Sequence, residues 1–312
     1  MFFALAFAGI AQNAHADVLS LGIYPPLMQI HATPPTFVQS PFTVTNSGSV
    51  PIYLKIVVRP FTQSDNDNGQ PQYLVMGQKI GEDPRIFQRM SVFDGTQNTD
   101  NITLAPQEKK NLELRINLPQ GEPAGDYYFS ITMLSNPVAT GQNSGAAIAG
   151  GISTNVLLSI GPQGDTTGYI QNFSAPFFLT QGPVPFILQV ANTSKHFINP
   201  EGTIIVKDMF GKIIGKVTIR QDTLVLANTS RYLTDTMSYA NPPKTPHPVA
   251  LWPQQFLLGP YSATLDIALS NQGPAFHQTI YFLALPVQML VGIFLAIILV
   301  SIITYRVKKR LQ

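Results

Sequence analysis

Most of this chain alternates apolar and polar residues with a period of two, which is the pattern of half-buried β-strands. The clearest runs are residues 52–58, 112–118, 127–133, 186–190 and 261–269. Turn-forming stretches rich in Gly, Asn and Pro separate these runs, as expected between short antiparallel strands. The pattern therefore predicts an all-β fold for the greater part of the chain.

The order of strands and turns occurs twice along the chain. Alternating residues lead into a turn at Asn46 in the first half and at Asn192 in the second. A turn-rich linker at 164–168 separates the halves. We therefore predict two tandem Ig-like antiparallel β-sandwiches, at residues 17–163 and 169–282. Because the chain has no cysteine, "Ig-like" describes the architecture only.

A long apolar run begins at Leu285 and ends at Thr304, and Gln288 is its only strongly polar side chain. A helix needs roughly 20 apolar residues to cross a bilayer core of about 30 Å. Tyr305 and the basic tail 306–312 follow, and such a flank is cytoplasmic under the positive-inside rule. We therefore predict a transmembrane helix at 285–305 in a single-pass cell-membrane protein, with the C-terminus cytoplasmic and the bulk of the chain extracytoplasmic.

Residues 1–16 have the form of a secretory signal peptide. An apolar run from Phe2 to Ile10 precedes the small-x-small sequence from Ala14 to Ala16. The basic residues that usually begin a signal are missing, since no Lys or Arg precedes Lys55. A buried first strand is the alternative interpretation, and we expect cleavage after Ala16.

Residues 77–101 interrupt the strand pattern because they are mostly polar. Asp83 is a suitable N-cap, and Pro84 suits the first position of a helix. We therefore predict one short helix within a long loop. Because binding residues concentrate on loops over a rigid scaffold, this loop is a candidate binding surface, and a passive insertion is the alternative.

The charge of the chain argues against nucleic acid as a partner. The sequence has 19 Lys and Arg and 17 Asp and Glu, and the tail holds four of the basic residues, which leaves 15 against 17 outside the membrane. A nucleic-acid-binding surface is distinctly positive. The balance is 8 basic against 12 acidic residues through Gly168, which disfavours ionic adsorption of the first half to anionic wall polymers. The absence of cysteine excludes disulfides, thiol chemistry and Cys-based zinc sites.

The sequence contains no evident catalytic or cofactor motif. The nucleophile elbow, the phosphate loop and the dinucleotide fingerprint are all missing. The carboxylates of Glu82 and Asp83 lie in a polar region, where solvation is a simpler reading than catalysis. We predict a non-enzymatic protein without cofactor or metal. The histidines are dispersed and lack metal-ligand spacing: His15, His31, His196, His247 and His277.

Three further features have both a structural and a functional interpretation. The acidic turn from Asp65 to Gly69 superficially resembles a calcium loop, but it lacks the twelve-residue pattern, so we prefer a hairpin turn. Trp252 lies in a Pro-rich stretch and could stack on a ligand, but we prefer a ring packed on the second sandwich. Four asparagines stand in the N-glycosylation motif, which often arises by chance: Asn101, Asn172, Asn192 and Asn228.

Short motifs in both halves resemble the WxL-interacting proteins of bacterial cell surfaces. The similar pieces are residues 42–46, 66–69 with Tyr73, 102–106 with Lys109 and Lys110, 190–193, 226–230 and 258–261. That family also carries a signal peptide and a C-terminal span with a short basic tail. The resemblance implies a peptidoglycan-binding domain paired with a host-binding domain. The polar region 77–101 and the Pro-rich stretch 242–253 depart from the family's pattern.

Two functions fit these observations. The first is a non-enzymatic, membrane-anchored cell-surface protein whose extracytoplasmic domains bind peptidoglycan, another wall polymer or a surface protein. The second is a membrane-anchored chaperone or assembly factor that lends a strand to secreted subunits, because sandwich edges can pair with extended peptides. A surface hydrolase, the third class, has no visible catalytic constellation. No individual partner-binding residue is predicted.

Overall fold

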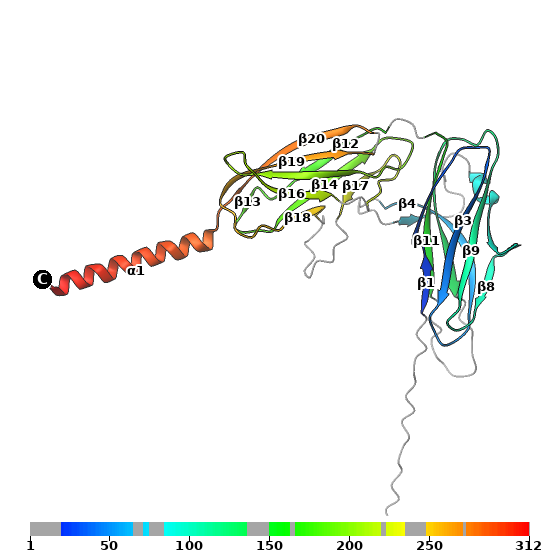
Figure 1. Cartoon of the computed structure of the whole chain (residues 1–312), viewed down its shortest axis with the longest axis horizontal. Helices are drawn as coiled ribbons and strands as arrows, with labels where there is room; N and C mark the ends of the chain where they lie inside the picture. Colours follow the sequence, from blue (N-terminus) through cyan, green and yellow to red (C-terminus); the bar gives the residue numbers. More distant parts are fainter. Residues whose placement is uncertain are drawn as a thin grey trace, which may run out of the picture. The chain divides into compact units, whose positions relative to one another are not determined.

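The computed structural model describes residues 20–64, 71–74, 84–135, 150–162, 166–219, 223–234, 248–270 and 273–311. The chain divides into two compact units. The first contains Met1–Pro60, Leu74–Pro123 and Tyr127–Ile160, and the second contains Phe61–Tyr73, Ala124–Asp126 and Gly161–Gln312. Each unit is built on a β-sandwich whose two sheets enclose an apolar core (Figure 1).

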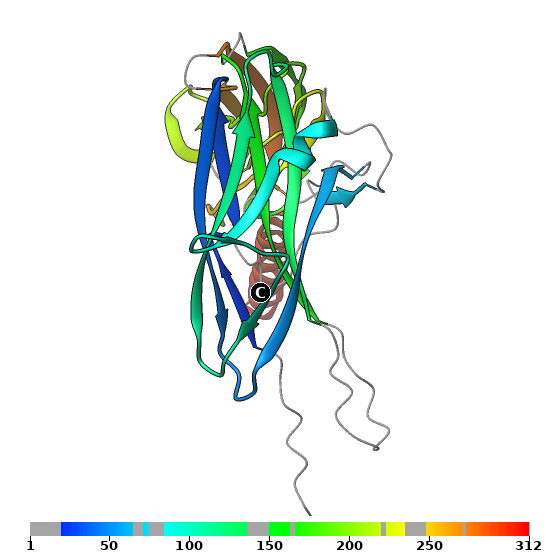
Figure 2. The same cartoon turned by 90° about the vertical axis from the view of Figure 1, so that its right-hand side faces the viewer.

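The first sheet of unit 1 is antiparallel. In spatial order it contains β1 (Leu21–Tyr24), β3 (Thr36–Asn46), β9 (Lys109–Leu118), β6 (Met90–Asp94) and β7 (Gln97–Asn98). The long strands β3 and β9 pair from Thr36 opposite Leu118 to Thr45 opposite Lys109. Figure 2 shows these long strands of the first unit.

The second sheet contains β2 (Leu27–Ala32), β11 (Gly151–Ile160), β10 (Gly125–Ser135) and β4 (Ile52–Gln63), and β8 (Asn101–Leu104) also pairs with β4. The last residues of β4, Phe61–Gln63, pair with β5 (Pro71–Tyr73), and both of these segments belong to unit 2. Pro25 and Pro26 separate β1 from β2. Because Pro cannot donate to a ladder, the chain leaves the first sheet there and joins the second. β2 runs parallel to β11, although the remaining described pairings of this unit are antiparallel.

Alternate residues of the predicted strands fill the core of unit 1. On β9 these side chains are at most 2% exposed, and on β10 at most 1% exposed. The residues between them point away from the core and are partly or fully exposed on β9. The period-of-two prediction is therefore confirmed for these strands. The core residues concerned are Leu112, Leu114, Ile116, Leu118, Tyr127, Phe129, Ile131 and Met133.

The structure corrects the prediction of a long loop at 77–101. A 3-10 helix, η1 (Pro84–Arg89), begins at the predicted proline, and Ile86 within it is fully buried. The chain then forms β6 and β7, and Met90 and Val92 of β6 join the core. The sequence pattern does not predict these strands, because they are short and too few of their positions need to be apolar. Residues 75–83, including Asp83, lie outside the described residues.

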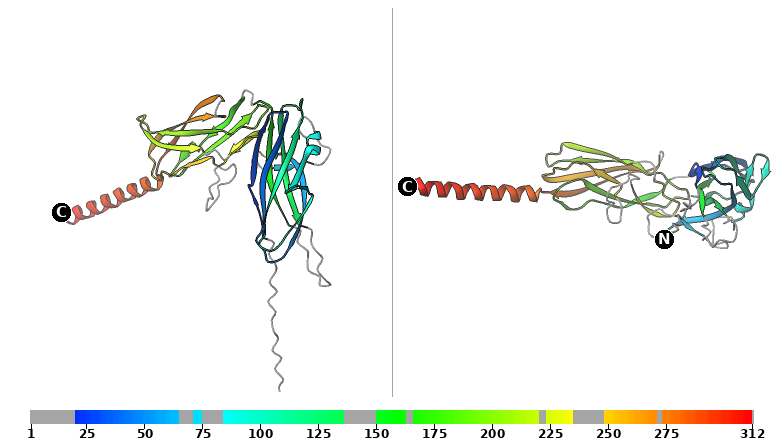
Figure 3. Two further views of the ribbon diagram at one scale, coloured as in Figure 1. Left: turned by 45° about the vertical axis from the view of Figure 1, so that its right-hand side comes forward. Right: turned by 90° about the horizontal axis from the view of Figure 1, so that it is seen from below.

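Unit 2 contains two sheets (Figure 3). One has β12 (Gly168–Ser174), β14 (Val184–Asn192) and β17 (Ser230–Leu233), and β18 (Ala250–Trp252) also pairs with β14. The other has β13 (Phe178–Leu179), β20 (Ala275–Ala284), β19 (Gly259–Ala268), β15 (Glu201–Lys207) and β16 (Ile213–Ile219).

Trp252 belongs to the core of unit 2. It is 5% exposed, and its ring meets Tyr261 edge-on at a centroid distance of 5.9 Å. Tyr261 in turn stacks on Phe282 at 5.3 Å. On its other side Trp252 lies against Gly215, where an added Cβ would be 2.5 Å from the indole Nε1. The preference for a packed ring over a ligand-stacking ring is confirmed.

The helix α1 (Val287–Leu311) follows β20 after Leu285 and Pro286. It begins two residues later than predicted from the sequence, because Pro286 closes the preceding strand. The segment Val287–Lys309 is long and apolar enough to cross a membrane, and none of it is buried against the rest of the chain.

The predicted fold class is confirmed: the protein is mostly β, with two Ig-like sandwiches and one long apolar helix at the C-terminal end. The predicted signal peptide at 1–16, the acidic turn at 65–69, the pair Glu82 and Asp83, and His247 lie outside the described residues.

Candidate functional site

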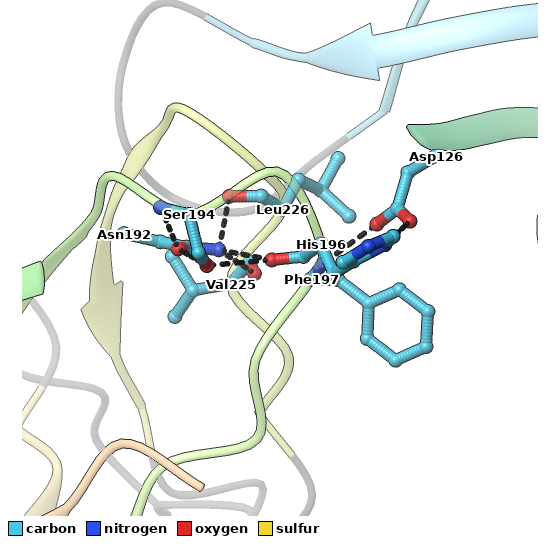
Figure 4. Close-up of polar contacts among 7 residues, drawn as sticks. All are labelled: Asp126, Asn192, Ser194, His196, Phe197, Val225 and Leu226. Carbon is cyan, nitrogen blue, oxygen red and sulfur yellow. Dashed lines mark hydrogen bonds and ion pairs between the residues drawn. The ribbon is translucent and has the colours of Figure 1, made fainter. Parts of the chain in front are cut away.

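A cluster of buried polar residues lies where β14 ends in the second unit (Figure 4). Asn192, the last residue of β14, is 2% exposed. Its Nδ2 donates to the main-chain oxygens of His196 at 2.9 Å, Leu226 at 3.0 Å and Val225 at 3.1 Å. Its Oδ1 accepts the main-chain N–H of Ser194 at 2.9 Å. One amide therefore bonds main-chain groups of two loops, as buried main-chain groups require partners.

The same cluster contains a carboxylate–imidazole pair. Asp126 belongs to the short segment Ala124–Asp126 of the second unit, and its side chain is 1% exposed. Its Oδ1 lies 2.8 Å from Nδ1 of His196, and its Oδ2 accepts the N–H of Phe197 at 2.5 Å. Both carboxylate oxygens are thus occupied in holding residues 196–197.

Asp126, His196 and Ser194 are the residue types of a serine-hydrolase triad, but their geometry differs from one. In a triad the serine hydroxyl reaches the imidazole nitrogen that the Asp does not hold. Ser194 Oγ instead lies 3.0 Å from the main-chain oxygen of His196 and also bonds Asn192 Oδ1. The hydroxyl is directed at groups of its own turn, so this arrangement does not form a nucleophile–base pair.

Unit 1 contains the same arrangement around Asn46, the fully buried last residue of β3. Its Nδ2 donates to the main-chain oxygens of Val50 at 2.8 Å, Ala105 at 3.0 Å and Leu104 at 3.4 Å. Its Oδ1 accepts the N–H of Gly48 at 2.9 Å. Each asparagine therefore bonds residues two and four positions ahead and two consecutive carbonyls of a later loop. We call this arrangement the Asn lock.

The repetition of the Asn lock identifies its role as structural. In both units the later loop also contains a non-glycine residue with positive φ, Gln107 at 60° and Asn228 at 55°. The structural role also accounts for Asn192 in the N-glycosylation motif. Its side-chain amide is buried and hydrogen-bonded within the protein. The sequence predicted both turns but not the function of the two asparagine amides. The later carbonyl groups that each amide bonds lie 33 and 34 positions away in unit 2, and 58 and 59 positions away in unit 1.

The other described histidines lie elsewhere. His277 pairs with Asp266 directly across from it on β19 and β20, and its side chain is 71% exposed. His31 lies on the exposed face of β2. Among the residues that the structure describes, no three His, Asp or Glu side chains come together in a metal-binding group.

The first part of β11 offers main-chain groups for a partner. β2 pairs with β11 only from Asn155 to Ile160, and β1 pairs with β3 in the other sheet. Asn155 N donates to Pro26 O at 3.1 Å. Main-chain groups alternate sides along a strand, so those of Gly151 and Ser153 face the same way as those of Asn155. Within the described residues no strand pairs with them there, and we call Gly151–Ser153 the open edge.

The chain is similar in fold to PapD-like pilus chaperones. The class 5 fimbriae chaperone CfaA aligns with 86% of this chain and 100% of its own, at 12% identity and a TM-score of 0.41. The E. coli chaperone DraB aligns with 84% of this chain and 99% of its own, at 13% identity and a TM-score of 0.38. A chain of the Salmonella enterica SafA pilin–SafB chaperone complex aligns with 85% of this chain and 99% of its own, at 11% identity and a TM-score of 0.36.

These values describe a distant likeness of fold. No protein-family model and no curated protein sequence matches the chain. The feature shared with the solved structures is the pair of Ig-like domains, and the resemblance to WxL-interacting proteins stays a prediction.

Proposed function

We propose that this protein is a non-enzymatic, membrane-anchored binding protein that works outside the cytoplasm and holds an extended segment of a secreted or surface protein. The open edge of β11 carries this proposal. An exposed strand edge presents unpaired N–H and C=O groups, and an extended peptide can add to it as a further strand. Of the two predicted functions, we therefore favour the chaperone or assembly factor.

The anchor in this proposal is α1. Its apolar side chains are exposed along the helix, and its length suits a bilayer core of about 30 Å. Arg306, Lys308 and Lys309 follow the apolar part and favour a cytoplasmic C-terminal end. The sandwiches would then lie on the opposite side of the membrane.

The proposed partner is a protein rather than a wall polymer for two reasons. The predicted loop at 77–101 is a candidate binding surface for either kind of partner, but residues 84–94 form η1 and β6, with core side chains. The open edge instead offers main-chain groups that suit an extended peptide. The excess of acidic residues through Gly168 also disfavours anionic polymers. The fimbrial chaperones are similar in fold, but that likeness is too distant to support the proposal, which rests on the open edge.

A photo-crosslinking experiment in intact cells tests the proposal. The full chain carries a benzophenone side chain at Ser153 on the open edge or, as a control, at Lys55, which is exposed and is paired on both sides, with Leu134 and with Asn101. We expect crosslinks from position 153 to extended segments of exported proteins, mapped by mass spectrometry. The control position should give none of these products.

Proline provides the matched variant. Gly151→Pro removes an N–H that an added strand would bond, whereas Gly151→Ala keeps it and adds the same Cβ. Added-strand crosslinks from the benzophenone at position 153 should therefore be lost with proline and persist with alanine. Equal crosslinking by both variants would reject strand addition at this edge, and recovery of the whole chain in the soluble cytosol would reject the anchor.

A further inference from the structure

We infer that the end of the second sandwich next to α1 is a lipid-binding rim that dips into the headgroup region of the membrane. This inference rests on the proposed anchor, since it requires α1 to lie in the bilayer. The rim consists of exposed apolar side chains on three chain segments: Phe177, Phe178, Met209, Phe210, Phe256 and Leu258.

The three segments lie together at one end of unit 2. Phe178 pairs with Leu283 near the end of β20, and Ala284 pairs with Gly259 at the start of β19. The Met209 side chain reaches Gly259: a Cβ added at Gly259 would lie 2.3 Å from Cε of Met209. Leu258 and Phe256 immediately precede Gly259 in the chain. The rim therefore surrounds the point where β20 leaves the sandwich. Figures 1 and 3 show α1 continuing from this end of the unit.

The connection to α1 is too short to hold this end away from a membrane. Only Leu285 and Pro286 separate Ala284 from Val287, so the chain spans at most about 11 Å between them. Leu285 N also donates to Leu179 O at 2.9 Å, which ties the connection to β13. With α1 in the bilayer, the rim must lie at the membrane surface.

The side chains of the rim suit that location. Phe210 is 86% exposed and Phe177 is 75% exposed, an unusual state for large apolar groups gathered on one end of a domain. The Asp208 carboxylate accepts the N–H groups of Phe210 and Lys212 at 2.9 Å each, so the acidic group is bound within its turn. The turn then presents an aromatic ring and, through exposed Lys212, a positive charge.

The opposite end of the unit has a different character. It contains the Asn lock and the polar residues 193–196, and Tyr169 on β12 is a large exposed apolar side chain near it. Aromatic side chains concentrate at membrane–water interfaces, where they bury their rings while polar groups stay wet. The lipid occupant is therefore the outer surface of the same bilayer that α1 crosses.

The test uses the absence of native cysteine, which allows single spin labels in the full chain. Labels replace Phe178, Phe210, Tyr169 or Leu295, one at a time, in nanodiscs of phosphatidylethanolamine and phosphatidylglycerol. Collision with a water-soluble nickel reagent and with oxygen reports depth. We expect positions 178 and 210 to lie within roughly 5–10 Å of the headgroup–acyl boundary, Tyr169 in water and Leu295 in the bilayer core.

The outcomes separate the rim from the anchor. If the label at Leu295 is buried but those at 178 and 210 are as water-accessible as the label at Tyr169, the rim is refuted and the anchor stands. If the label at Leu295 is water-accessible, both the rim and the membrane anchor are refuted. The unaltered protein provides a second measurement: headgroup photo-crosslinking lipids should modify peptides containing 177–178 and 208–212, whereas products confined to α1, or chain-to-chain products, would overturn the inference.

Discussion

Replacement of Asn192 by alanine should destabilise the second unit through the loss of a single buried amide. Ser194 N–H then loses the acceptor that the structure gives it. The three carbonyl oxygens each keep one donor: Ile198 N for Val225, Thr229 Oγ1 for Leu226 and Ser194 Oγ for His196. The main cost is therefore one buried unsatisfied N–H, with smaller losses from the weakened carbonyl contacts.

An unsatisfied buried N–H costs about 1–3 kcal/mol, and the lost bonds and small cavity bring the expected total to about 2–4 kcal/mol. With a urea slope of about 2 kcal/mol per molar, the unfolding midpoint should fall by about 1–2 M. Trp252 is the only tryptophan and lies in the core of this unit, so its fluorescence reports this transition. The full chain is measured in nanodiscs.

Two variants make the measurement specific. Gln278 is exposed on β20 of the same unit, and Gln278→Ala should change the free energy of unfolding by less than about 0.5 kcal/mol. Asn192→Asp should cost more than Asn192→Ala at neutral pH, because an ionised oxygen would face three carbonyl oxygens, and the difference should shrink as the pH falls. Equal midpoints for wild type and Asn192→Ala would refute the Asn lock as a stabilising element.

Three further predictions address the anchor and the two cores. Leu295→Arg should weaken membrane insertion by about 2.5–3.5 kcal/mol, seen as a fall in the membrane fraction, and unchanged fractionation would count against the span. Phe129 and Leu265 are fully buried, and truncation of either to Ala should cost about 2–5 kcal/mol in denaturant unfolding; a cost below 1 kcal/mol would contradict the described cores. Gly215→Ala should destabilise unit 2 by about 1–3 kcal/mol and shift the emission of Trp252, because the new methyl group would collide with the indole, and wild-type fluorescence would disprove that contact.

The sequence predicted those features that depend on neighbouring residues. Alternation identified the strand at 112–118 because one face of it is buried, and the apolar run identified α1 because a bilayer-length helix needs no other partner. The features it missed depend on distant residues. β6 has only five residues, too few for an alternating pattern to stand out, and the function of Asn46 depends on carbonyls of Leu104 and Ala105.

Arg231 illustrates the same limit. In the sequence it is one more basic residue of the second half, but in the fold its guanidinium is largely buried and donates to the main-chain oxygen of Leu224 at 2.6 Å. Burial lowers the pKa of Arg231 because it disfavours the charged form. A net charge counted from composition therefore overstates the basic surface of unit 2.

The parallel pairing of β2 with β11 also sets an order for folding. Leu27 pairs with Asn155, 128 positions later (155 − 27), so this ladder closes a much longer loop than a hairpin does. Closing such a loop costs entropy before its contacts form, which slows folding. A chain synthesised from its N-terminus cannot complete the first sandwich until Ile160 has been added. Until then β2 and β10 are both exposed to water without their shared neighbour, and the first unit depends on its remaining strands to avoid aggregation.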